Sequence, residues 1–167
     1  MGGDRVIIQA TDLSELRTAS PTRIIVFCSG SFDLLHPGHV WFLEACKSLG
    51  GSLVVAVGSD DVIGHRKAGR PIMSETARLK MIDSLKPVDY CYLDTITTTE
   101  NLLGGVEHAL KNLLPNAYAV RGDAFDIDAR YRLAEKLGSY LHVFDIRQSI
   151  WPALSTTAII EAICRPL

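Results

Sequence analysis

The stretch that decides the fold of this chain is Gly30-Ser31-Phe32-Asp33-Leu34-Leu35-His36-Pro37-Gly38-His39. It follows an apolar run of strand length, Ile24–Cys28, and it leads into a helical pattern over His39–Leu49. The two histidines therefore stand at a strand-to-helix turn, where unpaired backbone N–H groups carry partial positive charge. Histidine can donate hydrogen bonds to phosphate oxygens and changes protonation near neutral pH. The stretch predicts a site for a nucleotide triphosphate.

Apolar runs of strand length alternate with helical patterns from Arg23 onward. Strands are predicted at Ile24–Cys28, Leu53–Val57, Tyr90–Leu93, Ala117–Val120 and Leu141–Phe144. Helices are predicted at His39–Leu49, Ser74–Leu85, Thr99–Leu113, Ile127–Leu137 and Ser155–Ile163. Strands that are apolar on both faces and separated by helices favour a parallel sheet covered on both sides. The fold class is therefore α/β, a Rossmann-like doubly wound parallel five-stranded sheet in three layers, with ligands beyond the carboxyl ends of the strands.

Two parts of the chain are predicted, an N-terminal leader over residues 1–22 and a single domain over residues 23–167. The leader has no assigned role, and Asp12 to Leu16 can form a short helix. Two connections, Ser59–Met73 and Asp145–Leu154, are longer than a simple link requires. Long loops at one edge of a compact domain often cover substrate.

Composition describes an ordinary globular chain of 167 residues, 47% hydrophobic and 22% charged. No apolar run approaches the ~20 residues that span a bilayer, and the N-terminus lacks the order of a secretory signal. The formal net charge of −2 gives no overall attraction for nucleic acid or an anionic membrane. We therefore expect a cytoplasmic protein with no nucleic acid and no membrane among its partners, and any positive charge for a triphosphate must be gathered locally.

The cysteines are widely spaced and form no CxxC pair. Such spacing favours buried free thiols over disulfides or a zinc site. The residues concerned are Cys28, Cys46, Cys91 and Cys164.

Two polar clusters lie outside the deciding stretch. Arg66, Lys67 and Arg70 form a basic group in a glycine-containing loop. On composition alone, this group is equally consistent with a phosphate-binding cluster and with a solvated run of charges. Ser155–Thr157 precedes an apolar helical run, where one hydroxyl would suffice as a cap. The motifs of a dinucleotide-binding dehydrogenase (G-x-G-x-x-G) and of a P-loop ATPase (G-x-x-x-x-G-K-[ST]) are both missing from the sequence.

The deciding stretch resembles the HxGH signature of the nucleotidylyltransferase superfamily, in the GxFD-x-x-H-x-GH form of its cytidylyltransferase-like branch. Two further blocks resemble the same family, one from Arg66 through Arg70-Pro71-Ile72 to Arg78 and on to Tyr90, the other Ser155–Ile160. The three blocks stand in the family's order and span roughly residues 23 to 163. The branch includes heptose-1-phosphate adenylyltransferases, glycerol-3-phosphate cytidylyltransferases and archaeal FAD synthetases.

The resemblance implies a nucleotidylyltransferase that moves a nucleoside monophosphate from CTP or ATP to the phosphate of a small acceptor, releasing pyrophosphate by direct in-line attack. It implies Mg²⁺ held mainly by phosphate and water, with no metal ligands from the protein, and a homodimer. The preferred acceptor is a sugar or polyol phosphate, and FMN is an alternative. CTP and ATP stay equal choices. A catalytically silent nucleotide-binding module on the same fold is the alternative of a different class.

Site residues follow from the same resemblance. The residues expected to act on the triphosphate and the transition state are His36, His39, Lys67 and Arg78. Those expected to bind the nucleotide are Gly30, Ser31, Phe32, Gly38, Asp123, Arg147, Ser155, Thr156 and Thr157. Asp33 and Arg70 are expected to contact the acceptor, although Asp33 could equally tie its loop to nearby backbone N–H groups. The residues around Asp123, including Arg130, are read as surface.

Overall fold

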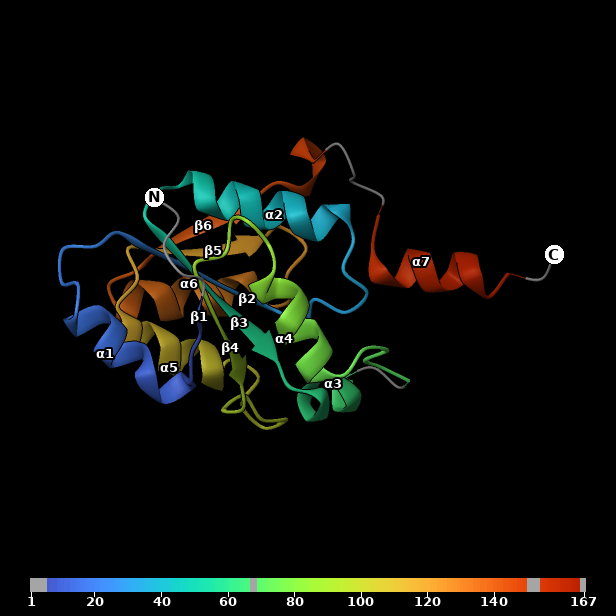
Figure 1. Cartoon of the computed structure of the whole chain (residues 1–167), viewed down its shortest axis with the longest axis horizontal. Coiled ribbons are helices and arrows are strands. Elements are labelled where there is room, and N and C mark those ends of the chain that lie inside the picture. Colours follow the sequence, from blue (N-terminus) through green and yellow to red (C-terminus); the bar gives the residue numbers. More distant parts are fainter. Residues whose placement is uncertain (1–5, 67–68, 150–153, 166–167) are drawn as a thin grey trace.

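A single parallel sheet runs through the molecule, which a computed structural model describes over residues 6–66, 69–149 and 154–165 (Figure 1). Across these residues the sheet has six strands in the order β1-β4-β3-β2-β5-β6, each paired in parallel with its neighbours. The strands are β1 (Val6–Ile7), β2 (Ile25–Gly30), β3 (Ser52–Gly58), β4 (Tyr90–Asp94), β5 (Ala117–Arg121) and β6 (Tyr140–Phe144). The α/β, doubly wound prediction is confirmed, and its strand count is corrected from five to six.

Helices cover both faces of the sheet and complete three layers (Figure 1). One face carries α1 (Leu13–Thr18), α5 (Gly104–Leu113) and α6 (Ile127–Lys136). The other carries α2 (Pro37–Ser48) and α4 (Glu75–Asp83). The remaining described elements are η1 (Ala10–Asp12), α3 (Asp60–Arg66), η2 (Ile146–Gln148) and α7 (Thr156–Ile163).

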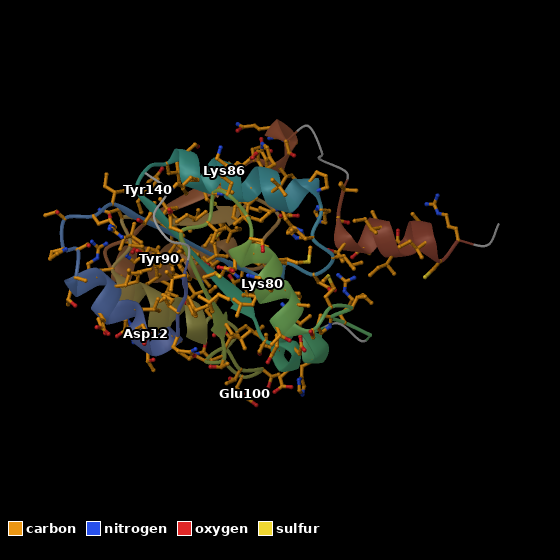
Figure 2. The ribbon with its side chains drawn as sticks, viewed as in Figure 1. Asp12, Lys80, Lys86, Tyr90, Glu100 and Tyr140 are labelled. Atoms are coloured by element: carbon orange, nitrogen blue, oxygen red, sulfur yellow. The ribbon has the colours of Figure 1, made fainter. Side chains whose placement is uncertain are left out.

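The core consists of two apolar clusters, one on each face of the sheet. Successive side chains of a strand point to opposite faces, so Phe27 packs under α1 and α5 while Val26 and Cys28 pack under α2 and α4. These strand residues have at most 1% of their surface exposed. Figure 2 shows Tyr140, at the start of β6, and Glu100, in the loop after β4, at opposite ends of the sheet. The loops at the Glu100 end, after the carboxyl ends of the strands, build the site.

The sixth strand comes from the leader. Ile8 N–H donates to the Cys91 carbonyl at 2.9 Å, so β1 adds to the free edge of β4. Leu13 is fully buried in the core under α5, and the Arg17 guanidinium donates to the Leu113 and Leu114 carbonyls. The sequence reading missed β1 because two residues are too short a run to show a period.

One helix is not predicted, and another begins later than predicted. The Ser59–Met73 connection contains α3, and the helical pattern expected from Thr99 begins only at Gly104. The later start has a physical cause in Asp94, whose carboxylate accepts the N–H groups of Ile96 and Thr97 at 2.9 and 3.0 Å. These bonds fold the segment after β4 into turns before a helix can begin.

Three of the cysteines are buried free thiols, as predicted. Cys164, the residue that follows α7, is exposed, which corrects the prediction for this position. That helix, α7, extends outward from the body of the molecule, while its first turn returns to the carboxyl edge of the sheet (Figure 1).

Candidate functional site

A pocket of about 350 Å³ opens at the carboxyl edge of the sheet, where the sequence placed the ligand site. The loops after β2, β4 and β5 and the first turn of α7 form its walls. Eleven of the predicted residues line it: Gly30, Ser31, Phe32, Asp33, His36, His39, Arg70, Asp123, Ser155, Thr156 and Thr157. The deciding stretch and the C-terminal hydroxyl trio, more than a hundred residues apart in sequence, therefore face one cavity.

His36 and His39 form a stacked pair at the start of α2, with ring centroids 3.8 Å apart. His36 is the N-cap, and its Nδ1 accepts the Gly38 N–H at 3.2 Å. His39 Nδ1 accepts the His36 N–H at 3.4 Å, so the two side chains satisfy the open end of the helix reciprocally. Because both Nδ1 atoms accept, each neutral ring carries its proton on Nε2. The pair is fixed as two Nε2–H donors.

The charge state of the pair follows from its surroundings. Burial, followed by the nearby Arg121 cation, lowers the pKa of His36 below its usual 6.5. Burial also lowers the pKa of His39 to about 3, with further contributions from His36 and Arg121 and an opposing one from Asp33. Both rings are therefore neutral at physiological pH in the free protein. An incoming polyanion would raise both pKa values.

Asp33 fastens the deciding loop to the segment before α4. Its carboxylate accepts the Ile72 N–H at 3.0 and 3.1 Å and the Met73 N–H at 3.0 Å. Arg70 Nε lies 3.2 Å from Asp33 Oδ2, an ion pair by distance that lacks the alignment of a hydrogen bond. Asp33 thus performs the structural task that sequence reasoning gave as the alternative to acceptor binding, while still lining the pocket.

Arg78 is fully buried and does not line the pocket. Its guanidinium donates to the Met73 carbonyl at 3.0 Å, the Ser31 carbonyl at 2.5 Å and Asp60 Oδ1 at 2.7 Å. With these donors occupied by the protein, the side chain braces the deciding loop from behind.

The braced loop is strained. Phe32 and Leu34 have φ of 50° and 45°, the left-handed region that non-glycine residues rarely adopt. Each such residue costs on the order of 1 kcal/mol and persists only where the surroundings enforce it. Arg78 on Ser31 and Asp33 on Ile72 provide that enforcement.

The first turn of α7 closes the pocket from the C-terminal side. Ser155 is the N-cap, and its Oγ accepts the Ala158 N–H at 3.1 Å. Thr156 Oγ1 donates to the Asp33 carbonyl at 2.6 Å and so attaches the turn to the deciding loop. The Ser-Thr-Thr run therefore supplies a cap, a link and Thr157 at the pocket wall.

Two other predicted residues that the structure describes, Gly38 and Arg147, do not line the pocket. Gly38 lies beneath His36, where an added Cβ would come within 3.0 Å of the imidazole Cε1. Arg147 is 86% exposed and pairs with its neighbour Asp145, which raises the pKa of Arg147 and lowers that of Asp145. Lys67 lies outside the described residues.

Sequence reasoning missed several pocket residues, among them Asp94, Thr97, Arg121 and Arg130. Arg121 Nε and Nη2 donate to the Asp123 carboxylate at 3.0 and 2.8 Å, so Asp123 is the partner of a site cation. Arg130 was read as surface, but only 6% of it is exposed. A signal existed, because Ile127, Arg130 and Ala134 share one helix face at spacings of three and four.

Over the described residues, no cluster of three or more His, Cys, Asp or Glu side chains could hold a metal ion. None of the described helices is long and apolar enough to cross a membrane.

Fold and site together define a protein of the nucleotidyltransferase class. The chain belongs to the cytidylyltransferase-like family, whose model matches residues 27–162. The recognition made from the HxGH stretch is thereby confirmed.

The curated relatives include FAD synthases from methanogenic archaea. That of Methanothermobacter marburgensis is 40% identical over 119 residues, 69% of this chain and 67% of the relative. That of Methanocorpusculum labreanum is 48% identical over 68 residues, 41% of this chain. The chain spans about half the length of most of these FAD synthases, as in the 47% covered for Methanocorpusculum labreanum.

The similar solved structures include two that bear on the fold and the family. A lipopolysaccharide core biosynthesis protein from Thermoplasma volcanium has 32% identity and a TM-score of 0.55, covering 72% of this chain and 93% of its own. Pantoate-beta-alanine ligase from Francisella tularensis, solved with a β,γ-ATP analogue and β-alanine, has 13% identity and a TM-score of 0.64, covering 95% of this chain and 76% of its own. The second likeness shows the fold alone.

Proposed function

We propose that this chain transfers AMP from ATP to the phosphate of FMN, forming FAD and releasing pyrophosphate. The observation that carries nucleotidyl transfer is the fixed His36–His39 donor pair at the start of α2, facing the same pocket as Ser155–Thr157. The choice of ATP and FMN is supported by relatives that are FAD synthases, 38–48% identical over the aligned segments.

In this reaction a phosphate oxygen of FMN attacks the α-phosphorus of ATP. The new phosphorus–oxygen bond forms as the bond to the oxygen bridging the α- and β-phosphorus breaks, and the electron pair leaves with pyrophosphate. No covalent enzyme intermediate is needed, so the protein contributes position and charge neutralisation. The Nε2–H groups of His36 and His39 donate to the phosphates, and the partial positive charge at the start of α2 favours the polyanion there.

Mg²⁺ enters this proposal with the nucleotide. The carboxylates at the pocket do not fit a cage built by the protein, because Asp33 and Asp94 accept backbone N–H groups and Asp123 pairs with Arg121. Magnesium commonly keeps water and substrate phosphate as its main ligands. We therefore place it on the triphosphate as part of the substrate.

A sugar phosphate is the second candidate acceptor. The lipopolysaccharide core biosynthesis protein, similar along 93% of its own length, favours a sugar phosphate, which is also the acceptor preferred from the sequence.

Cytoplasmic location and a homodimer, both expected from the sequence, stay predictions; light scattering decides the oligomeric state.

The test is a matrix of two nucleotides and three acceptors. Purified protein with Mg²⁺ is incubated with ATP or CTP and with FMN, heptose 1-phosphate or glycerol 3-phosphate, and both pyrophosphate release and the nucleotidylated product are measured. FAD formed with ATP supports the proposal. Product only from a sugar phosphate replaces the acceptor, and no product from any pair favours the silent module. A His39→Ala variant serves as the control for contaminating activity.

A further inference from the structure

Three arginines face the pocket, and two of them have carboxylate partners. Arg70 pairs with Asp33 at 3.2 Å, and Arg121 pairs with Asp123 at 2.8 Å. Arg130 has no carboxylate within ion-pair distance among the residues that the structure describes. It is the most deeply buried of the three, with 6% of its surface exposed.

Arg130 is held rigidly by neutral groups. Its Nε donates to the Phe125 carbonyl at 2.9 Å and its Nη1 donates to the Tyr118 hydroxyl. The guanidinium carbon lies 4.4 Å from the centre of the Phe125 ring, which offsets part of the cost of burying a cation. Neutral acceptors and a ring do not neutralise the charge, and a buried cation without a counter-ion is costly. Such a group at a pocket wall is prepared for an anionic ligand.

The position of Arg130 decides which anion this is. Tyr118 and Val120 of β5 belong to the core under α5 and α6, so Arg130 lies on that side of the sheet. The histidine pair lies on the other side, where Phe32, 5.6 Å from His39 between ring centroids, joins the core under α2. The Arg130 guanidinium and the histidine pair therefore reach the pocket from opposite faces of the sheet.

In-line transfer needs that separation. The attacking oxygen and the leaving oxygen stand on opposite sides of the phosphorus. With the triphosphate at the start of α2, the acceptor must enter from the α5–α6 side. On that side Val106 and Val120 give an apolar wall, and Arg130 is a cation with no carboxylate partner among the described residues.

We propose that Arg130 binds the phosphate of the acceptor and positions it for attack. The inference rests on the proposed function only for the identity of the acceptor as FMN. The ligand that this subsite requires is a phosphate monoester, to which the guanidinium donates charge-assisted hydrogen bonds.

The test compares Arg130→Met with Arg132→Met, an exposed arginine two residues along the same helix. Steady-state FAD formation is measured while FMN and ATP are varied in turn. Arg130→Met raises the KM for FMN at least about tenfold, because charge-assisted bonds are lost, and leaves the KM for ATP within about twofold. Arg132→Met changes neither. A rise confined to the KM for ATP overturns the proposal and assigns Arg130 to the nucleotide.

Riboflavin, which lacks the phosphate of FMN, shows whether Arg130 contacts the phosphate or the ring. With α,β-methylene-ATP and Mg²⁺ saturating, FMN and riboflavin are titrated by calorimetry into wild type and Arg130→Met. The proposal requires a loss of FMN binding with riboflavin binding unchanged. An equal loss for both would place Arg130 on the isoalloxazine and overturn it. If Arg130→Met does not fold, Arg130→Lys keeps the charge without the fork and is required to weaken FMN alone.

A wild type that forms no FAD refutes the FMN proposal without deciding on Arg130. In that case inorganic phosphate is titrated into the same α,β-methylene-ATP complex. Binding to wild type and to Arg132→Met, lost in Arg130→Met, supports the phosphate subsite. Equal binding to all three proteins, or none to wild type, refutes it.

Discussion

Two of the helices that begin at the pocket, α2 and α7, are attached to the molecule in opposite ways. α2 starts from a capped pair of imidazoles and buries Phe42, Leu43 and Cys46 in the core. α7 buries none of its residues and extends outward from the body. Its first turn reaches the deciding loop through the hydrogen bond from Thr156 to the Asp33 carbonyl.

This difference indicates that the α2 side of the pocket is preformed, whereas the α7 side is completed when a ligand binds. On the α2 side, Arg78 and Asp33 fix the loop before any substrate arrives. On the α7 side, the hydroxyls are in place while little burial stabilises the helix behind them. We expect substitutions behind α2 to change stability or turnover strongly and those at α7 to act mainly on nucleotide affinity.

Arg78→Met should be the most damaging change, because it removes three hydrogen bonds from a fully buried guanidinium. The free energy of unfolding should fall by about 3 kcal/mol, measured by urea denaturation. Lys80→Met, on the same helix with a side chain 72% exposed, is the matched control. Equal midpoints for the two variants would mean that the α2 wall is not held from behind.

His39→Ala should lower kcat for FAD formation by about 10²-fold or more while the fold survives, because one fixed donor to the phosphates is lost. His65→Ala, which alters an exposed imidazole on α3, should keep normal turnover. Turnover of His39→Ala close to wild type would remove the histidine from the mechanism.

Acid should weaken the α2 wall specifically. Because the pKa of His39 falls from 6.5 to about 3 on folding, the unfolded chain binds more protons between these values. Stability is therefore full above pH 6.5 and declines as pH falls toward 3, by at most about 1.4 kcal/mol per pH unit from this group. Denaturation series at pH 7, 6 and 5 measure the decline. His39→Asn should show a shallower slope, and identical slopes would contradict the assignment.

Thr156→Val should have the smallest effect on stability, within about 0.5 kcal/mol, since α7 buries no residue. The KM for ATP should rise about fivefold. The hydrogen bond to the Asp33 carbonyl, worth about 1 kcal/mol, is lost, and it attaches the first turn of α7 to the pocket. Thr18→Val, which removes an exposed hydroxyl bonded to Glu15 on α1, controls for the substitution itself. A large fall in thermal midpoint for Thr156→Val would erase the contrast between the two helices.

The strands were predictable because both of their faces are apolar. Each predicted strand ends within two residues of the observed one, as Leu53–Val57 against β3 shows. The first residues of helices were harder to predict where side chains compete for backbone N–H groups. Thr99 stands in a pattern that suits a helix, but Asp94 has already captured the N–H groups ahead of it.

The site was predictable where local order carries the chemistry. Gly30–His39 includes the cap of α2, which His36 and His39 form within four residues, so this part of the site follows from adjacent residues. Arg78 and Arg130 are different, because their guanidinium groups also bond to residues on other elements. Arg78 meets the Ser31 carbonyl 47 positions away, and Arg130 meets a hydroxyl on a neighbouring strand. Neither partner could be read from the sequence around the arginine.

The leader has a consequence for solubility. Unpaired N–H and C=O groups along the outer side of a strand are a template for joining another chain. By pairing through Ile8 with Cys91, β1 occupies that template on β4, and Leu13 plugs the apolar surface beside it. Removing the first twenty residues would leave β4 open to strand addition from a neighbouring molecule. A truncated protein should accordingly self-associate even with every pocket residue intact.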